Sequence, residues 1–257
     1  MAPSCMEENT VLGVRIGSLV LYPHAMVLPF ALAFFLVISW RMLLKAADGR
    51  RNRALCILLC SAGFGVAGAA ILGLAGNGVN RETIANLELH FCSFGGYWGA
   101  LIGASLAASA LRTPILAVLD ALVPGIVAGG AVARIGCLFA GCCRGIPFST
   151  PFWGIIQPLY WWPALDMAAL MAVLAGIIYL RARQSANHSV CGSVTALFLV
   201  AYSLPRFLLE FVRDAQHILY PFTYGHVMAG VQMIAGLGLV LWLRTQRART
   251  GHPGLDA

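Results

Sequence analysis

Residues 115–136 read ILAVLDALVPGIVAGGAVARIG, an apolar run in which Asp120 and Arg134 are the charged residues. The run is long enough to cross the hydrocarbon core of a bilayer, which takes about 20 mostly apolar residues. Further runs of this kind lie on both sides of it, at 17–40, 54–75, 94–111, 160–180, 191–211 and 226–243. The sequence therefore predicts an all-α membrane protein with seven transmembrane helices.

Composition supports this prediction. Of the 257 residues, 60% are apolar and 11% are charged, whereas soluble domains average about 25% charged residues. So little charge cannot cover the surface of a soluble domain of this size. Because no Gly/Ser-rich or Pro-rich linker divides the chain, residues 1–257 are expected to form a single polytopic membrane domain. Glu7 and Glu8 lie where a signal peptide would be basic, so we expect no cleaved signal.

The distribution of basic residues indicates an orientation. The net charge is +7, from 17 Lys and Arg against 10 Asp and Glu. Loops rich in Lys and Arg stay on the cytoplasmic side. With the N-terminus outside, most of the basic residues fall on inner loops: Arg41, Lys45, Arg50, Arg51, Arg53, Arg112, Arg181, Arg183, Arg244, Arg247 and Arg249. The pattern therefore predicts an external N-terminus and a cytoplasmic C-terminus.

Six arginines fall outside the inner loops, and two of them lie within predicted spans, Arg134 in the fourth and Arg206 in the sixth. An arginine within a span is costly, so it usually faces a partner or a water-filled cavity. Glu210 lies four residues after Arg206 on the same helix face and can pair with it. Taken alone, this pair could simply stabilise the helix bundle. The acid nearest to Arg134 in the sequence is Asp120, several turns away. Because a guanidinium holds phosphate with two parallel hydrogen bonds, the two arginines predict a site for a phospholipid phosphate.

The segments around these arginines resemble the bacterial prolipoprotein diacylglyceryl transferase family. Residues 133–145, ARIGCLFAGCCRG, are similar to its G-R-I-G-N-F-I-N-G-E-x-x-G signature, and residues 206–213, RFLLEFVR, match its R-F-x-x-E-F-x-R element. Residues 99–103, GALIG, resemble part of its H-G-G-L-I-G motif. The resemblance implies the same seven-span topology in the bacterial cytoplasmic (inner) membrane.

The family's reaction moves the diacylglyceryl group of phosphatidylglycerol to the thiol of a lipobox cysteine in a prolipoprotein signal peptide. The resemblance implies that Arg134 and Arg206 clamp the departing phosphate and that Glu210 orients Arg206. A base must also accept the thiol proton, and the candidates are His24 and His226. The implied substrate-binding residues are Gly99, Gly103, Gly136, Gly141, Gly145, Arg144 and Arg213. We expect no cofactor, no metal and no nucleic acid.

The chain departs from the family at several motif positions. The family histidine falls on Trp98, the signature asparagine on Cys137 and the signature glutamate on Cys142. Two alternatives therefore remain open. The protein is either a related lipid-group transferase with a different acceptor, or a non-catalytic protein that binds or transports an anionic phospholipid. Arg144 and Arg213 lie nearer the interface, where they could also snorkel.

The cysteines carry a separate prediction. Cys92, Cys137, Cys142 and Cys143 fall near the predicted outer side. Disulfides form in such an oxidising compartment. The sequence leaves open whether these residues form a disulfide or pack as small apolar side chains.

Overall fold

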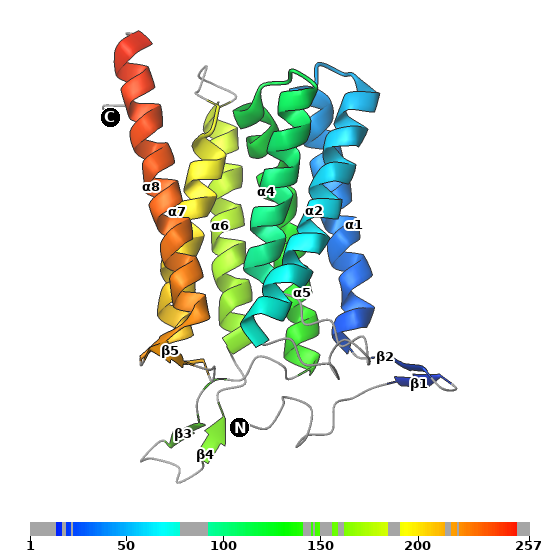
Figure 1. Cartoon of the computed structure of the whole chain (residues 1–257), viewed down its shortest axis with the longest axis vertical. Helices are drawn as coiled ribbons and strands as arrows, with labels where there is room; N and C mark the ends of the chain where they lie inside the picture. The colour runs from blue at the N-terminus through cyan, green and yellow to red at the C-terminus, as the bar shows by residue number, and fades with distance from the viewer. Residues whose placement is uncertain are drawn as a thin grey trace.

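The computed structural model describes residues 14–16, 19–21, 23–77, 92–140, 145, 147–149, 156–158, 162–184, 191–213, 217–219 and 221–250. Within these ranges the chain forms seven α-helices that run alternately up and down in one bundle (Figure 1). They are α1 Pro23–Ala46, α2 Arg51–Asn77, α4 Ser93–Ala110, α5 Ile115–Ala140, α6 Trp162–Gln184, α7 Ser193–Glu210 and α8 Tyr224–Thr250. The prediction of a membrane protein built from long apolar helices is therefore confirmed.

Three short antiparallel hairpins lie together at one end of the bundle (Figure 1). They pair β1 Val14–Ile16 with β2 Leu19–Leu21, β3 Pro147–Ser149 with β4 Ile156–Pro158, and β5 His217–Leu219 with β6 Phe222–Thr223. The register sets Val14 opposite Leu21 and Leu219 opposite Phe222. The sequence analysis did not predict these hairpins, because strands of two or three residues carry too little hydrophobic periodicity.

The start predicted for the first span is wrong. We placed this span at 17–40, whereas β1 and β2 occupy Val14–Leu21 and the helix begins at Pro23. Proline suits the first turn of a helix, because its fixed φ is helical and its missing N–H would have no intrahelical partner there. The apolar residues before Pro23 therefore belong to a hairpin rather than to the helix.

Six of these seven helices, all but α4, are long and apolar enough to cross a membrane. Their outward surfaces carry large exposed apolar side chains, including Phe30, Ile71 and Ile234. Such a surface suits contact with lipid tails. α4 holds many Gly, Ala and Ser residues and fewer large apolar ones, because it lies inside the bundle against α2 and α5.

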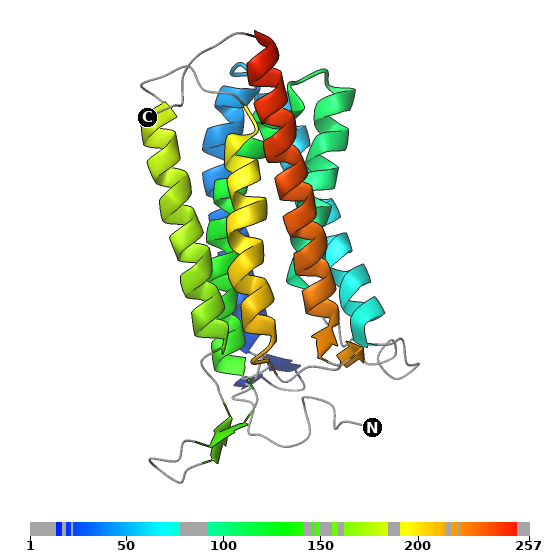
Figure 2. The same cartoon turned by 90° about the vertical axis from the view of Figure 1, so that its left-hand side faces the viewer.

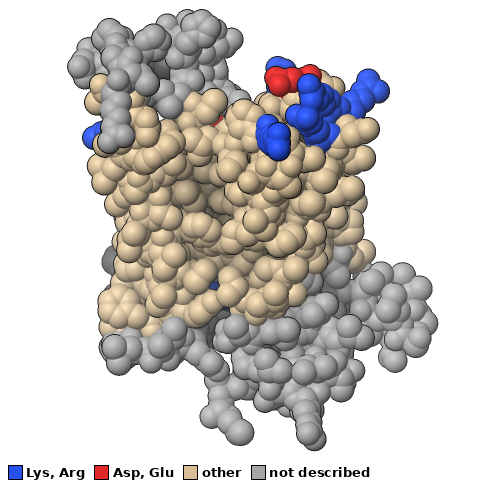
Figure 3. Space-filling view, turned by 45° about the horizontal axis from the view of Figure 1, so that its top comes forward, with Lys and Arg blue, Asp and Glu red and all other residues tan. Residues whose placement is uncertain are grey.

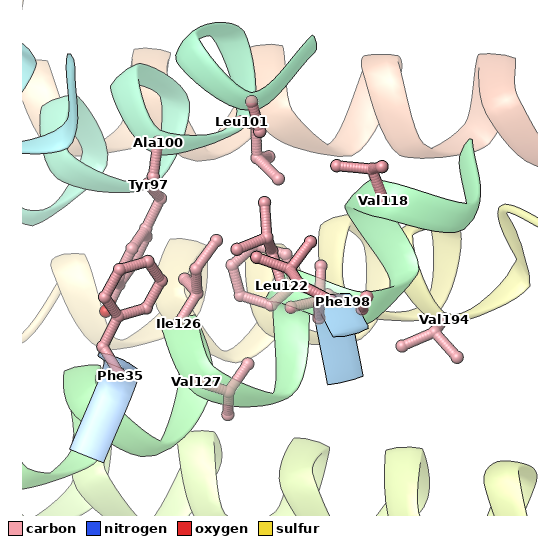
Figure 4. Close-up of a cluster of buried hydrophobic side chains, with 14 of the residues drawn as sticks. Phe35, Tyr97, Ala100, Leu101, Val118, Leu122, Ile126, Val127, Val194 and Phe198 are labelled. Atoms are coloured by element: carbon pink, nitrogen blue, oxygen red, sulfur yellow. The ribbon is translucent and has the colours of Figure 1, made fainter. Parts of the chain in front are cut away.

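α5 is the central helix of the bundle. Of its span, 67% is buried, against 17% for α2, and it packs against α1, α4, α6 and α7. Figure 4 shows Leu122, Ile126 and Val127 of α5 among side chains from neighbouring helices. The core is therefore built around the helix that carries Arg134.

Glycines bring α2 and α4 into backbone contact. A Cβ on Gly68 would lie 2.4 Å from the carbonyl oxygen of Gly95, and one on Gly95 would lie 2.1 Å from that of Gly68. Small residues allow such close approach between membrane helices. Gly68 therefore serves close packing between the two helices. Gly63, also on α2, faces open space.

Basic side chains gather at one end of the bundle. Arg50 and Arg51 are exposed between α1 and α2, and Figure 3 shows basic side chains gathered at the end opposite the hairpins. A turn at the same end contains Arg112, whose φ of 52° lies in the left-handed region. This turn lies just before Pro114, and α5 begins at the next residue.

α8 packs mainly against α7 and β6. Figure 1 shows α8 at one edge of the bundle, and in Figure 2, where that edge faces the viewer, it lies in front next to α7. In the space-filling view the apolar surface is hollowed near its middle (Figure 3).

Candidate functional site

Buried charged side chains gather near the hairpin end of the bundle. At this end α4, α6 and α8 begin and α5 and α7 finish (Figure 1). The buried charged residues here are Arg134, Asp166, Arg206 and Glu210. Buried charges in a membrane protein are expensive and mark functional sites by default. This cluster is therefore the candidate site.

The first ion pair joins α5 to α6. Arg134 Nε lies 2.5 Å from Asp166 Oδ2, and the side chains are 8% and 0% exposed. The Tyr202 hydroxyl donates to the same carboxylate, 3.1 Å from Oδ1 and 3.3 Å from Oδ2. The partner of Arg134 thus comes from a different helix. Asp120, its nearest acid in sequence, instead accepts hydrogen bonds from the amides of Gly192 and Thr195 at 2.7 and 2.8 Å.

The second ion pair lies within α7. Arg206 Nη1 is 2.5 Å from Glu210 Oε2, and both side chains are almost fully buried. The pairing that the four-residue spacing predicts is therefore confirmed. The Arg206 guanidinium also lies over the Phe94 ring, with Cζ 5.3 Å from the ring centroid.

Both arginines reach the first turn of α4. Arg134 Nη2 donates to Ser93 Oγ at 2.9 Å, and Arg206 covers the next residue, Phe94. The first N–H groups of a helix have no intrahelical partners and give this end a partial positive charge. Two guanidinium groups and a helix N-terminus thus converge, which is an arrangement suited to an anion.

Glu210 accepts hydrogen bonds from residues at both ends of the α7–α8 connection. Its Oε1 accepts hydrogen bonds from Thr223 Oγ1 at 2.9 Å and from Arg213 Nη1 at 3.3 Å. The side chain of Arg213 is 30% exposed. It therefore remains accessible to solvent while it pairs with Glu210. With Arg213 included, the cluster holds three arginines against two acids, Asp166 and Glu210. The described cluster therefore keeps an excess positive charge.

His226 is the third residue of α8 and reaches back to the residue before the helix. The amide of Thr223 donates to its Nδ1 at 3.1 Å. This arrangement resembles half of a capping box. Because Nδ1 accepts this bond, the neutral ring carries its proton on Nε2, and the lone pair of Nδ1 is already engaged. The contacts of Nδ1 therefore favour a capping role over that of a general base.

Aromatic rings enclose His226. Its ring centroid lies 4.2 Å from that of Phe211, 4.9 Å from that of Phe207 and 5.6 Å from that of Phe222. This packing fixes the imidazole next to the Glu210 cluster. It also brings β6 and the start of α8 against the end of α7.

The glycines predicted to bind substrate fall into two groups, one in a helix contact and one nearer the charged cluster. Gly99 and Gly103 lie in the α2–α4 contact, where a Cβ would come within 2.2 Å of the Phe64 carbonyl oxygen and 2.6 Å of the Phe64 Cβ, respectively. Helix packing accounts for both positions. Gly136 is buried on α5, and Gly145 forms a β-bridge with Arg213, close to the Glu210 cluster.

Several predicted site residues lie outside what the structure describes. They are the side chain of His24, whose backbone belongs to α1, and the residues Gly141, Cys142, Cys143 and Arg144. Cys92 and Cys137 are described and form no disulfide. Cys137 Sγ instead accepts a hydrogen bond from Arg134 Nη1 at 3.9 Å. Cys137, which stands where the family has asparagine, thus contacts Arg134.

Sequence reasoning missed Asp166, Tyr202, Ser93 and Thr223. Asp166 had a usable signal, because an acid inside an apolar span is a candidate functional residue. The hydroxyl residues had none, since Ser, Thr and Tyr are common in helices and turns. Among the described residues, no group of three or more His, Cys, Asp or Glu side chains could hold a metal ion.

Comparison with known proteins points to one family. Residues 12–242 match the family model described as prolipoprotein diacylglyceryl transferase. A phosphatidylglycerol–prolipoprotein diacylglyceryl transferase of Nitratidesulfovibrio vulgaris is 31% identical over 163 residues, which cover 61% of each chain. Transferase 2 of Clostridium perfringens is 28% identical over 134 residues, covering 48% of this chain and 50% of that protein.

The transferase of Cupriavidus pinatubonensis is 28% identical over 174 residues, covering 62% of this chain and 60% of that protein. The aligned stretch thus spans between half and about three-fifths of the length of these relatives. The family model, by contrast, extends over most of the chain, including Arg134, Arg206 and Glu210. The chain therefore belongs to the prolipoprotein diacylglyceryl transferase family.

Proposed function

We propose that this protein transfers the diacylglyceryl group of phosphatidylglycerol to the thiol of a prolipoprotein lipobox cysteine. The observation that carries the proposal is the convergence of Arg134 and Arg206 on Ser93 and Phe94, in the first turn of α4. The names of its relatives supply the substrate class.

In the proposed reaction the thiol sulfur attacks the glyceryl carbon that carries the phosphate. A C–S bond forms, the C–O bond to phosphate breaks, and glycerol phosphate leaves with the electron pair of that bond. A base takes the thiol proton. Arg134 and Arg206 would stabilise the charge that develops on the departing phosphate, as preorganised donors do in a site with little water.

The other residues would have supporting roles. Glu210 holds Arg206 through the 2.5 Å contact, so it is a positioning residue in the proposal. Gly136, Gly141, Gly145, Arg144 and Arg213 remain proposed contributors to substrate binding. The capping hydrogen bond of His226 leaves His24 as the proposed base.

A turnover assay tests the proposal. Purified protein is given phosphatidylglycerol labelled in its glycerol headgroup, with and without a lipobox peptide. We expect labelled glycerol phosphate to be released and the peptide to become lipidated, and we expect Arg134→Lys and Arg206→Lys to reduce both. Gly230→Ala is the matched control, because a Cβ on this α8 residue meets nothing within 4 Å. No release by folded wild-type protein would contradict the proposal.

A second candidate function is the same transfer to a different acceptor. It is favoured by Cys137, which contacts Arg134 where the family has asparagine. Release of glycerol phosphate without lipidation of the peptide would support this alternative. Binding of phosphatidylglycerol that depends on the arginines, without any release, would indicate a non-catalytic lipid-binding protein.

We also infer a topology with seven spans, an external N-terminus and a cytoplasmic C-terminus, in the bacterial inner membrane. It is supported by the alternating helix directions and by the basic residues at the end opposite the hairpins (Figures 1 and 3). Fusions to the C-terminus test it. A green fluorescent protein fusion should fluoresce and an alkaline phosphatase fusion should be inactive, and the opposite result would contradict the orientation.

A further inference from the structure

We propose that Asp166, supported by Tyr202, positions Arg134 and limits the affinity of its guanidinium for anions. The inference rests on the proposed function, in which Arg134 holds the lipid phosphate. It assigns a role to Asp166, a buried acid that binds this arginine from another helix.

Asp166 contacts a particular edge of the guanidinium. Its Oδ2 lies 2.5 Å from Nε, the nitrogen nearest the side-chain stem. The terminal nitrogens point elsewhere, because Nη2 donates to Ser93 Oγ and Nη1 to Cys137 Sγ. The carboxylate thus fixes the plane of Arg134 with its Nη groups directed at α4 and Cys137.

Tyr202 fixes Asp166 in turn. Its hydroxyl donates to both carboxylate oxygens, and its ring is held by aromatic neighbours. It stacks on Phe198 with centroids 5.9 Å apart and meets the edge of Tyr97 at 5.8 Å. Asp166 and Tyr202 are both 0% exposed, so water does not compete for these bonds.

The charges have a consequence for ligand binding. A phosphate that approaches Arg134 also meets the negative charge of Asp166 behind it, and this repulsion weakens anion binding at low dielectric. The hydroxyl of Tyr202 reduces that repulsion by donating to the carboxylate. Removing the charge of Asp166 and removing the hydroxyl of Tyr202 should therefore change phosphatidylglycerol affinity in opposite directions.

Two variants test the inference, with phosphatidylglycerol in phosphatidylcholine nanodiscs as the binding probe. Asp166→Asn keeps the shape and removes the charge, so we expect roughly 10-fold tighter binding. Its kcat for glycerol phosphate release should fall about 10- to 100-fold, because Arg134 loses its orientation. Tyr202→Phe should bind more weakly than wild type, by about 3-fold, because the Asp166 carboxylate keeps its charge and loses the hydroxyl that donated to it.

Asp120→Asn is the matched control. Asp120 is also a buried acid in a span, but its carboxylate binds the start of α7, at Gly192 and Thr195. We expect this variant to lower the thermal stability while leaving the Kd and kcat of the folded protein unchanged. A purely structural role for Asp166 would give the same pattern as this control.

The outcomes separate the inference from the proposed function. Weaker or unchanged binding in Asp166→Asn would overturn the inference, even in an active protein. If Asp166→Asn does not fold, Tyr202→Phe decides: weaker binding at unchanged melting temperature supports the inference, and unchanged binding overturns it. Wild-type protein that binds phosphatidylglycerol but releases no glycerol phosphate overturns the proposed function, while the comparison of Kd values still tests the inference.

Discussion

The Glu210 carboxylate lies directly against the backbone of Gly225, and a Cβ at position 225 would be 2.3 Å from Oε1 and 2.7 Å from Oε2. A side chain at the second position of α8 would therefore displace the Glu210 carboxylate from its contacts with Arg206 and Thr223. The start of α8 forms one wall of the charged cluster. Contacts between α7 and α8 thus determine where an acid of the site can lie.

Gly225→Ala should displace the Glu210 carboxylate and impair the site. We expect a loss of about 10- to 100-fold in glycerol phosphate release, because a shift of about 1 Å in a positioning group has effects of this size. The measurement is kcat/KM of the purified variant. Gly230→Ala, on the same helix but facing open space, should keep wild-type activity. Equal effects of the two substitutions would show that the contact with Glu210 is unimportant.

His226→Gln separates a capping role from a catalytic one. Glutamine at the third helix position can also accept a hydrogen bond from the amide of the residue before the helix. It cannot act as a base. We therefore expect His226→Gln to retain activity within about 3-fold, whereas His226→Ala should destabilise α8 by about 1 kcal/mol through loss of the cap.

Activity and thermal unfolding are compared for both His226 variants. A folded His226→Gln protein that has lost all release of glycerol phosphate would contradict the capping role. It would then favour His226 as the base.

The sequence was most informative where partners lie on one element. The Arg206–Glu210 pair could be predicted because residues four apart share a helix face. The Arg134–Asp166 pair depends on how α5 packs on α6, which no local pattern encodes. Asp120, the acid nearest to Arg134 in the sequence, binds the start of α7 instead.

Segment type was likewise more predictable than segment ends. The long apolar runs identified the helices, while Pro23 decided where the first one begins. The roles of the glycines depended on their neighbours. A sequence motif includes Gly99, but the Phe64 backbone of another helix explains why a side chain would not fit there.

Gly99→Ala tests that packing explanation. Its Cβ would lie 2.2 Å from the carbonyl oxygen of Phe64, so α2 and α4 must separate. Overpacking of this kind costs about 1–3 kcal/mol. We expect a lower melting temperature in detergent, with the KM for phosphatidylglycerol unchanged in the folded fraction.

Gly63→Ala is the control on α2, where a Cβ meets nothing within 4 Å. It should leave the melting temperature unchanged or raise it slightly, because alanine favours the helix over glycine. A rise in KM with unchanged stability in Gly99→Ala would instead support the substrate-binding role that the motif implies.

Arg206→Lys tests whether the site needs a guanidinium or only a positive charge. Lysine keeps the charge but lacks the planar fork that can bind Glu210 and a phosphate together. Losing one hydrogen bond to a charged group costs about 1.5–3 kcal/mol, so we expect kcat/KM to fall about 10- to 100-fold.

Arg213→Lys is the comparison. Its side chain is 30% exposed and its contact with Glu210 is 3.3 Å, so we expect a loss of about 2-fold, as for partly exposed ion pairs. Equal losses in the two variants would mean that net charge, rather than the geometry of Arg206, holds the anion.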